Sequence, residues 1–305
     1  MFRRSVFSFL PLVLAGLPAL AAPPEPSIDF IHLTDTHVLE LTGVFPPIAA
    51  ARQHFSETAV ALSAFLAAPP QGRPDFFLVT GDLIDAYRFT GSGDRPVPGQ
   101  IERFQRAVAQ TVAPLYLALG NHDVVHYRLN ENDKLDSDQS GAGEARASWI
   151  TAFDCFRRGT YYSLSKQAGP TRYHILVLDN AYRGGIAPEQ LQWIGREVKA
   201  ATDAVIVVAL HIPLADDANS RAIKTALASA GNVALVLAGH KHTSGIEEIV
   251  IGGSKVVQIR TAAFGYGSNN WRRVTLRSDR IDVSATGKPE RIETTLPTLV
   301  SVPAQ

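Results

Sequence analysis

Five short polar blocks between residues 35 and 242 could carry chemistry in this chain. They are Asp35-Thr36-His37, Gly81-Asp82, Gly120-Asn121-His122-Asp123, a lone His211, and Gly239-His240-Lys241-His242. Apart from His122 and Asp123, the blocks supply two carboxylates, one amide and four imidazoles. Groups of these types and in this number form the ligand set of two adjacent divalent metal ions. The blocks therefore predict a dinuclear metal centre.

Each block follows an apolar run that is typical of a buried strand. The runs are Phe30-Ile31-His32-Leu33, Phe76-Phe77-Leu78-Val79, Leu115-Tyr116-Leu117-Ala118-Leu119, Val205-Ile206-Val207-Val208-Ala209-Leu210 and Val233-Ala234-Leu235-Val236-Leu237-Ala238. Continuous apolar runs are typical of strands that are covered on both faces. Polar groups at several such carboxyl ends meet in one crevice of an α/β sheet. The glycines before Asp82, Asn121 and His240 let the backbone turn sharply as it leaves the sheet.

The blocks resemble the pattern of the calcineurin-like metallophosphoesterase superfamily, which is D-x-H, G-D, G-N-H-[DE], H and G-H-x-H. The match runs from Asp35 to His242 and lacks no block. The resemblance implies an α/β fold in which two facing mixed β-sheets are flanked by helices. It also implies a metal-dependent phosphoric ester hydrolase.

The resemblance further implies a role for each site residue. One metal ion would be bound by Asp35, His37 and His242, the other by Asn121, His211 and His240, and Asp82 would bridge the two. His122 would be the acid near the leaving group. Asp85 stands where related phosphatases carry a carboxylate that pairs with this histidine, and it would orient the imidazole and raise its pKa.

The expected chemistry follows from the metal pair. Two cations about 3.5–4 Å apart acidify a shared water to hydroxide and hold the non-bridging oxygens of a phosphate. The predicted function is therefore hydrolysis of phosphate esters by attack of a metal-bound hydroxide. The two divalent ions could be manganese, iron or zinc. The imidazole of His122 can donate a proton to the departing oxygen or stabilise the phosphoryl charge.

Two departures from the pattern narrow the branch of the superfamily. Purple acid phosphatases carry a tyrosine three residues after the bridging aspartate, and Asp85 in that position argues against a tyrosinate-bound ferric site. In protein serine/threonine phosphatases the aspartate that corresponds to Asp85 is followed by arginine, whereas here it is followed by Ala86. Those enzymes also use G-N-H-E, whereas this chain ends the block with Asp123. The remaining resemblance is to the phosphodiesterase branch.

A preference for phosphodiesters is predicted because Lys241 is the only basic residue inside any block. An extended segment would turn Lys241 away from both metals. Arg128, Arg272 or Arg273 could still fold over the site. Two alternatives stay open, namely a phosphomonoesterase or nucleotidase acting on small phosphate esters and a non-catalytic metal-binding or phosphate-binding protein of the same fold.

The amino terminus predicts export to the periplasm or secretion. Arg3 and Arg4 precede an apolar stretch from Val6 to Leu20, so residues 1–21 are expected to be a cleaved signal peptide rather than a membrane anchor. Without these residues the chain has 27 basic against 29 acidic residues, since two of the 29 basic residues are removed. This balance gives no reason to expect a nucleic-acid partner. The expected partner is a small phosphate ester, and the oligomeric state stays open.

The rest of the chain is expected to form one metallophosphoesterase domain over residues 22–285, followed by a tail over residues 286–305 that either packs on the surface or is disordered. Helices are predicted where Phe55, Ala59, Leu62 and Leu66 repeat, and where Leu191, Ile194 and Val198 follow Pro188. Beyond His242 the pattern predicts short strands, with a first turn at Gly252-Gly253. These strands are Ile246–Ile251, Lys255–Ile259, Arg272–Leu276 and Arg280–Ser284.

Several polar groups have a plainer interpretation. The segment 124–144 is expected to be a lid or a mobile loop, and its resemblance to a calcium loop fails at Ala147, where a glutamate is required. Asp123 is expected to hold a loop by accepting from backbone amides, and His32 and His174 are expected to be structural. Cys155 allows no intrachain disulfide and is expected to be a small buried hydrophobe on a helix.

Overall fold

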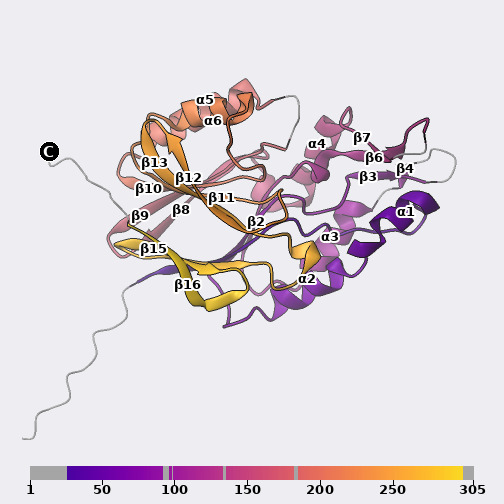
Figure 1. Ribbon diagram of the computed structural model, residues 1–305, viewed down its shortest axis with the longest axis horizontal. Helices are drawn as coiled ribbons and strands as arrows, with labels where there is room; N and C mark the ends of the chain where they lie inside the picture. The colour runs from indigo at the N-terminus through magenta and orange to yellow at the C-terminus, as the bar shows by residue number, and fades with distance from the viewer. Residues whose placement is uncertain (1–25, 92–95, 98, 133–134, 182–184, 298–305) are drawn as a thin grey trace, which may run out of the picture.

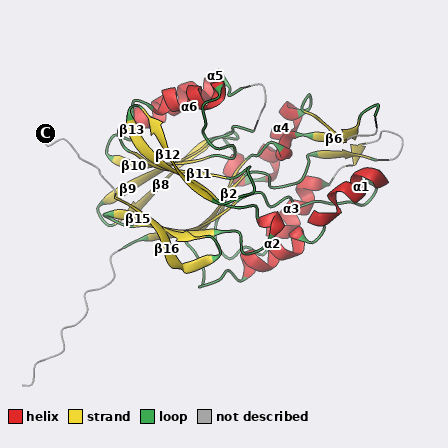
Figure 2. Ribbon diagram, viewed as in Figure 1, coloured by secondary structure: helices red, strands yellow, loops and turns green. Residues whose placement is uncertain are grey.

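Two large β-sheets face each other, and helices cover their outer faces (Figures 1 and 2). The structure is a computed structural model that describes residues 26–297 except 92–95, 98, 133–134 and 182–184. The predicted fold class is confirmed. The proposed signal peptide, residues 1–21, lies outside the described residues. Among the helices that are described, none is long and apolar enough to cross a membrane.

The first sheet has the strand order β16-β15-β14-β1-β2-β5. Its strands are β1 (Ile28–Leu33), β2 (Phe76–Thr80), β5 (Leu115–Ala118), β14 (Arg272–Leu276), β15 (Arg280–Ala285) and β16 (Lys288–Pro297). The strands β1, β2 and β5 run parallel, so their carboxyl ends lie at one edge of the sheet. The loops that carry Asp35, Asp82 and Asn121 leave from this edge.

The second sheet has the order β12-β13-β11-β10-β9-β8. Its strands are β8 (Tyr162–Ala168), β9 (Thr171–Val177), β10 (Ala204–Ala209), β11 (Val233–Ala238), β12 (Gly245–Ile251) and β13 (Ser254–Arg260). The parallel strands β10 and β11 end just before His211 and His240, respectively. The second sheet thus supplies the remaining ligand loops.

The apolar runs are buried on both faces, as their composition predicts. In β1, Phe30 packs between the two sheets, whereas Ile31 and Leu33 pack outward against helices. In β10, Val207 faces the same inter-sheet core and Ile206 packs outward. Burial of alternate residues on opposite faces stabilises both sides of each central strand, at about 25 cal/mol per Å² of apolar surface.

The two helices that the periodicity predicts are present as α2 (Thr58–Ala67) and α5 (Pro188–Ala200), and further helices join them on the sheet faces. The outer face of the first sheet packs against α2, α3 (Gln100–Val108) and α4 (Ala142–Ala152), and that of the second sheet against α5 and α6 (Ala218–Leu227). Pro188 occupies the first turn of α5, and the side chain of Asp217 caps α6 by accepting from two backbone amides. Cys155 lies partly buried in a short 3₁₀ helix, Asp154–Phe156.

A small third sheet lies beside the two large ones and replaces the loop expected at residues 124–144 (Figure 1). It has the order β4-β3-β6-β7, with β3 (Arg88–Thr90), β4 (Pro96–Val97), β6 (His126–Leu129) and β7 (Leu135–Asp138). The helix α1 (Pro46–Arg52) packs near this sheet through a shared apolar cluster. The sequence suggests a loop because the segment is long and polar. Its strands are short and are completed by pairing with β3, which lies far away in sequence.

The calcium-loop pattern in this region is not realised. Its residues are divided between β7 and α4. Asp136 pairs with Arg128 at 3.6 Å, and Asp138 accepts a hydrogen bond from the Ser140 amide. Within the described residues, no cluster of metal-ligating side chains occurs there.

The carboxyl-terminal strands are confirmed, but the segment that follows them is part of the sheet. Lys288–Pro297 forms β16, which pairs with β15 at the edge of the first sheet. Leu296 reaches the inter-sheet core and the Thr295 hydroxyl bonds Asp282. The described part of the domain therefore extends beyond residue 285, and residues 298–305 lie outside the described part. Most of β16 is exposed and polar, so its sequence resembles that of a tail.

Candidate dinuclear metal centre

The structure brings the predicted ligands together in two groups that share Asp82. The first group is Asp35, His37, Asp82 and His242, and the second is Asp82, His211 and His240. Within each group, the candidate ligand atoms lie within 4.8 Å of one another. The Asn121 side-chain oxygen lies 3.2 Å from His211 Nε2, which places it beside the second group. Asp82 is thus the residue that both groups have in common.

The ligand loops hold a backbone conformation that is uncommon outside glycine. In the described part of the chain six non-glycine residues have a positive φ, and five of them are predicted ligands: Asp35, His37, Asp82, His240 and His242. Such residues are strained and persist only where the surroundings enforce them, typically at functional sites. The segment from His240 to His242 is therefore bent rather than extended. Lys241 is nevertheless exposed.

Main-chain hydrogen bonds between neighbouring loops enforce this conformation. The amide of Asp35 donates to the Gly81 carbonyl and that of His37 to the Asp82 carbonyl, each at 2.9 Å. In the second sheet, Gly239 donates to the His211 carbonyl at 3.0 Å. The loops therefore brace one another through the backbone.

Two glycines are required by the close approach of these loops. A Cβ atom at Gly120 would lie 2.1 Å from the Asp82 amide nitrogen, and one at Gly239 would lie 1.8 Å from the Thr34 hydroxyl. Both distances are far below a permitted contact, so any side chain at these positions would displace Asp82 or Thr34.

The charges in the cluster suit divalent cations. Asp35 and Asp82 are buried next to four imidazoles. Burial alone lowers the pKa of His211, but the charge and hydrogen bond of Asp82, together with the charge of Asp35, raise it to about 9. Burial alone also raises the pKa of Asp82, whereas the charges of His211 and His122 lower it well below its usual range. The protein thus holds protons where cations would bind, and metal ions would displace them. The donor set fits two divalent ions.

His122 lies at the edge of this cluster in a defined orientation. Its Nδ1 lies 2.7 Å from the main-chain carbonyl oxygen of Asp85. A carbonyl oxygen only accepts, so Nδ1 carries the hydrogen. The other nitrogen, Nε2, lies 4.0 Å from the Asp82 carboxylate. His122 therefore directs Nε2 toward the proposed metals.

The Asp85 carboxylate lies closer to His37 and Arg52 than to His122, the histidine with which the resemblance pairs it. The carboxylate bonds His37 Nδ1 at 3.1 Å and the Arg52 Nε at 2.6 Å, whereas its nearest oxygen lies 3.7 Å from His122 Nδ1. A second hydrogen bond from Arg52 makes this ion pair bidentate. Arg52 draws the carboxylate toward α1, so Asp85 orients the proposed ligand His37 by its side chain and His122 by its backbone. Burial lowers the pKa of His122, and the charges of Asp82 and Asp85 oppose this shift, so Asp85 acts on the pKa in the predicted direction.

Sequence reasoning did not find Arg52 or Tyr127. The Arg52 guanidinium lies over the rings of Phe55 and Tyr127, at 5.2 and 5.6 Å from their centroids. The Tyr127 hydroxyl lies 3.1 Å from His122 Nδ1. Neither residue stands in a recognisable motif, since α1 and β6 bring them to the site from separate parts of the chain. Alternation along β6 would have distinguished Tyr127 from the neighbouring His126, which instead contacts Thr90.

The plainer interpretations agree with the geometry. Asp123 is buried and accepts hydrogen bonds from the amides of Gly120 and Ile84. His32 contacts two threonine hydroxyls at 2.8 Å, and His174 pairs with Glu197. These three residues therefore support the loops and sheets, and they bring no further ligand to the cluster.

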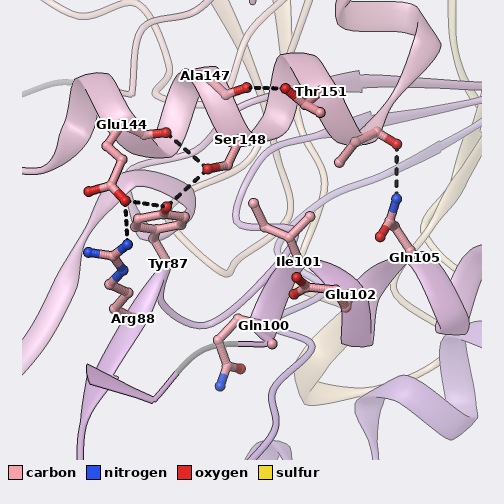
Figure 3. A pocket seen from close by; sticks show the side chains of 12 residues that line it. Tyr87, Arg88, Gln100, Ile101, Glu102, Gln105, Glu144, Ala147, Ser148 and Thr151 are labelled. Atoms are coloured by element: carbon pink, nitrogen blue, oxygen red, sulfur yellow. Dashed lines mark hydrogen bonds and ion pairs between the residues drawn. The ribbon is translucent and has the colours of Figure 1, made fainter. Parts of the chain in front are cut away.

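A separate cavity of about 670 Å³ lies between α3 and α4 (Figure 3). Tyr87, Ser148 and Glu144 share hydrogen bonds on one wall, and Gln105 donates to a carbonyl of α4. No predicted ligand lines this cavity. Its polar groups bond one another, so the metal-ligand cluster remains the better candidate for chemistry.

Comparison with protein families identifies the chain. The model of the calcineurin-like phosphoesterase family matches residues 28–244. This chain belongs to that family. Membership makes it a metal-dependent phosphoester hydrolase, and it implies a dinuclear divalent metal site and phosphate ester substrates. The matched residues include every predicted ligand. No curated protein matches the chain.

Solved structures share the fold at low sequence identity. A dimetal phosphatase from Danio rerio is 13% identical with a TM-score of 0.60, and the match covers 90% of this chain and 100% of that one. A purple acid phosphatase from yellow lupin is 12% identical with a TM-score of 0.54, covering 89% of this chain and 53% of that one. GAP50 of Plasmodium is 13% identical with a TM-score of 0.53, covering 89% and 88%. At these identities the similarity establishes the fold alone.

Proposed function

We propose that the protein hydrolyses phosphodiesters in preference to phosphomonoesters at a dinuclear centre. One ion would be held by Asp35, His37 and His242 and the other by Asn121, His211 and His240, with Asp82 shared. When bound, two such ions supply an activated water and neutralise the charge of the phosphate.

The observation that supports a diester preference is the pairing of the nearby arginines. Arg52, which lies beside the cluster, is bound bidentately to Asp85. The other arginines that could have folded over the site are engaged elsewhere. Arg128 pairs with Asp136, Arg272 with Glu293, and Arg273 with Asp29. A monoester dianion carries an extra negative charge that usually requires an added cation.

His122 is proposed to assist departure of the leaving group. Breaking the ester P–O bond leaves charge on the departing oxygen, and the hydroxyl that joins phosphorus comes from water. The negative charge of a bound phosphate favours the protonated imidazole. Nδ1 remains bound to the Asp85 carbonyl, so the proton is donated from Nε2.

The ligand set argues against a purely binding role. GAP50, which shares the fold, is named as an anchor of a membrane complex, so the fold alone does not establish catalysis. In this chain, however, all seven proposed ligands lie in one cluster and His122 is oriented toward it. A binding protein would not need His122 in this place.

The diester preference is tested with two esters that share a leaving group. With Mn²⁺ supplied, kcat/KM for bis-(4-nitrophenyl) phosphate should exceed kcat/KM for 4-nitrophenyl phosphate. A clear advantage of the monoester would contradict the proposal and favour the phosphomonoesterase alternative.

We also propose that the protein is exported, because residues 1–21 have the composition of a signal peptide. Amino-terminal sequencing of the protein recovered from the producing cell should begin at Ala22. Recovery of the intact Met1 terminus from the cytoplasm would contradict export.

A further inference from the structure

Tyr266 is an exposed aromatic side chain at the edge of the metal-ligand cluster. The residue is 59% exposed, and its ring centroid lies 5.1 Å from that of the proposed ligand His242. The exposed ring of His54 lies beside it, with 18° between the two ring planes and 5.9 Å between centroids. These two side chains form an aromatic pair next to one of the proposed metal positions.

The backbone next to Tyr266 is fixed to the ligand loop that carries Asp35. Tyr266 ends the 3₁₀ helix η4 (Phe264–Tyr266). In this helix the Phe264 amide donates to the Thr34 carbonyl at 3.0 Å and the Gly265 amide to the Asp35 carbonyl at 2.9 Å. The approach is so close that a Cβ atom at Gly265 would lie 3.2 Å from the Asp35 carbonyl oxygen. The position of Tyr266 is thus set by the same loop that carries a proposed ligand.

Other residues anchor η4, and the Tyr266 ring adds one edge contact with Phe55, at 5.2 Å between centroids, while the rest of the ring is exposed. Phe264 is buried and packs against Phe65, with 5.4 Å between ring centroids. The Asn270 side chain donates to the Ala263 carbonyl at 2.8 Å. Leaving a large aromatic ring in water has an energetic cost that a substrate contact would offset.

We propose that Tyr266, with His54 beside it, binds a planar aromatic arm of the phosphate ester. The inference rests on the proposed function, which places the phosphate at the metal centre. Aromatic rings attract one another at centroid separations of about 4.5–7 Å. The Tyr266 ring lies 5.1 Å from that of the proposed ligand His242, so it is close to where the phosphate would bind. An aromatic group joined to phosphorus by a short linker would therefore reach the exposed ring. Aryl and nucleoside arms share this chemistry.

Calorimetric binding of two unreactive phosphonates tests the proposal without relying on turnover. The Mn²⁺-loaded protein is titrated with phenylphosphonate and with methylphosphonate, which share the charged group. In Tyr266→Ala the affinity for phenylphosphonate should fall about 3- to 10-fold, the usual effect of one aromatic contact, and the affinity for methylphosphonate should stay unchanged. Tyr266→Phe, which keeps the ring, should bind like the wild type.

The matched control is Ile292→Ala, which removes a similarly exposed side chain, 52% exposed, from β16 at the edge of the first sheet. It should change neither affinity. Equal affinities of the wild type for both phosphonates, or an equal loss for both in Tyr266→Ala, would overturn the proposal. Neither result depends on which class of ester is hydrolysed, so the diester proposal fails or stands separately.

Kinetics then distinguish the source of the aromatic arm. Phenyl, thymidine and methyl esters of 4-nitrophenyl phosphate share a leaving group, and Tyr266→Ala should raise KM for the phenyl or the thymidine ester relative to the methyl ester. The larger increase identifies an aryl or a nucleoside arm. An unchanged KM for both aromatic esters would count against the proposal.

Discussion

The ligand loops and the rim around them are built in different ways. Main-chain hydrogen bonds join the Asp35 loop to the Asp82 loop and the His211 loop to the Gly239 loop, and most of these loops include strained ligand residues. The rim consists of α1, the small third sheet and η4, and its side chains Arg52, Tyr127 and Tyr266 lie next to the cluster. Of these elements, η4 also bonds the Asp35 loop through its main chain. We therefore expect the loops to hold the metal ions, and the rim to orient the ligands and to contact the substrate.

This difference predicts different responses to mutation. Changes in the ligand loops should lower stability or abolish metal binding. Changes in the rim should lower metal affinity, activity or substrate specificity in a protein that stays folded. Three variants test this division.

The largest of the three effects is expected for His122→Ala, which lies where loop and rim meet. The variant should keep its fold and metals but lose about 10²–10⁴-fold in kcat, the typical contribution of a positioned acid or base. The loss should shrink for esters with very good leaving groups, since these require little protonation. The measurement is kcat over a series of aryl esters together with metal content.

An equal loss across the series would argue against proton donation by His122. Loss of metal from the variant would indicate that His122 is itself a metal ligand.

Asp123→Ala tests the loops themselves. Asp123 accepts hydrogen bonds from two backbone amides, those of Gly120 and Ile84. Each amide left unpaired and buried costs about 1–3 kcal/mol, so the free energy of unfolding should fall by about 2 kcal/mol or more in a denaturant titration. Asp136→Ala, which removes a more exposed carboxylate paired with Arg128 at 3.6 Å, is the control and should cost less than about 1 kcal/mol. Similar losses in both variants would show that Asp123 has no special role in the loops.

Arg52→Met tests the rim and has the smallest expected effect. Methionine keeps apolar contact with Phe55 and Tyr127 but releases Asp85, so His37 loses its orientation. Metal affinity should fall about 10- to 100-fold, the usual effect of a group that orients a ligand, with the fold intact by circular dichroism. Arg88→Met, which removes an ion pair between β3 of the small sheet and Glu144 of α4, should leave metal affinity unchanged. An unchanged metal affinity in Arg52→Met would show that Arg52 does not help to orient His37.

The same contrast explains what sequence could predict. Each ligand block begins within two residues of the end of a strand, so Asp35, Asp82 and His240 could be placed at the ends of strands from local pattern alone. Arg52 and Tyr266 come from segments that approach the cluster only after folding, and no spacing in the chain marks them. Asp85 was found, but its closer side-chain contacts with His37 and Arg52 depend on α1 and could not be predicted. The strand β16 was missed because most of it is exposed and polar.

Metal content of the purified protein tests the central claim most directly. Elemental analysis should give close to two divalent ions per wild-type chain. Asp82→Asn should lose ions from both sites, because Asp82 is the residue that the two ligand groups share. Its activity should fall beyond the roughly 10²–10⁴-fold that one acid or base contributes. A full complement of metal in Asp82→Asn with unchanged activity would contradict the dinuclear centre proposed here.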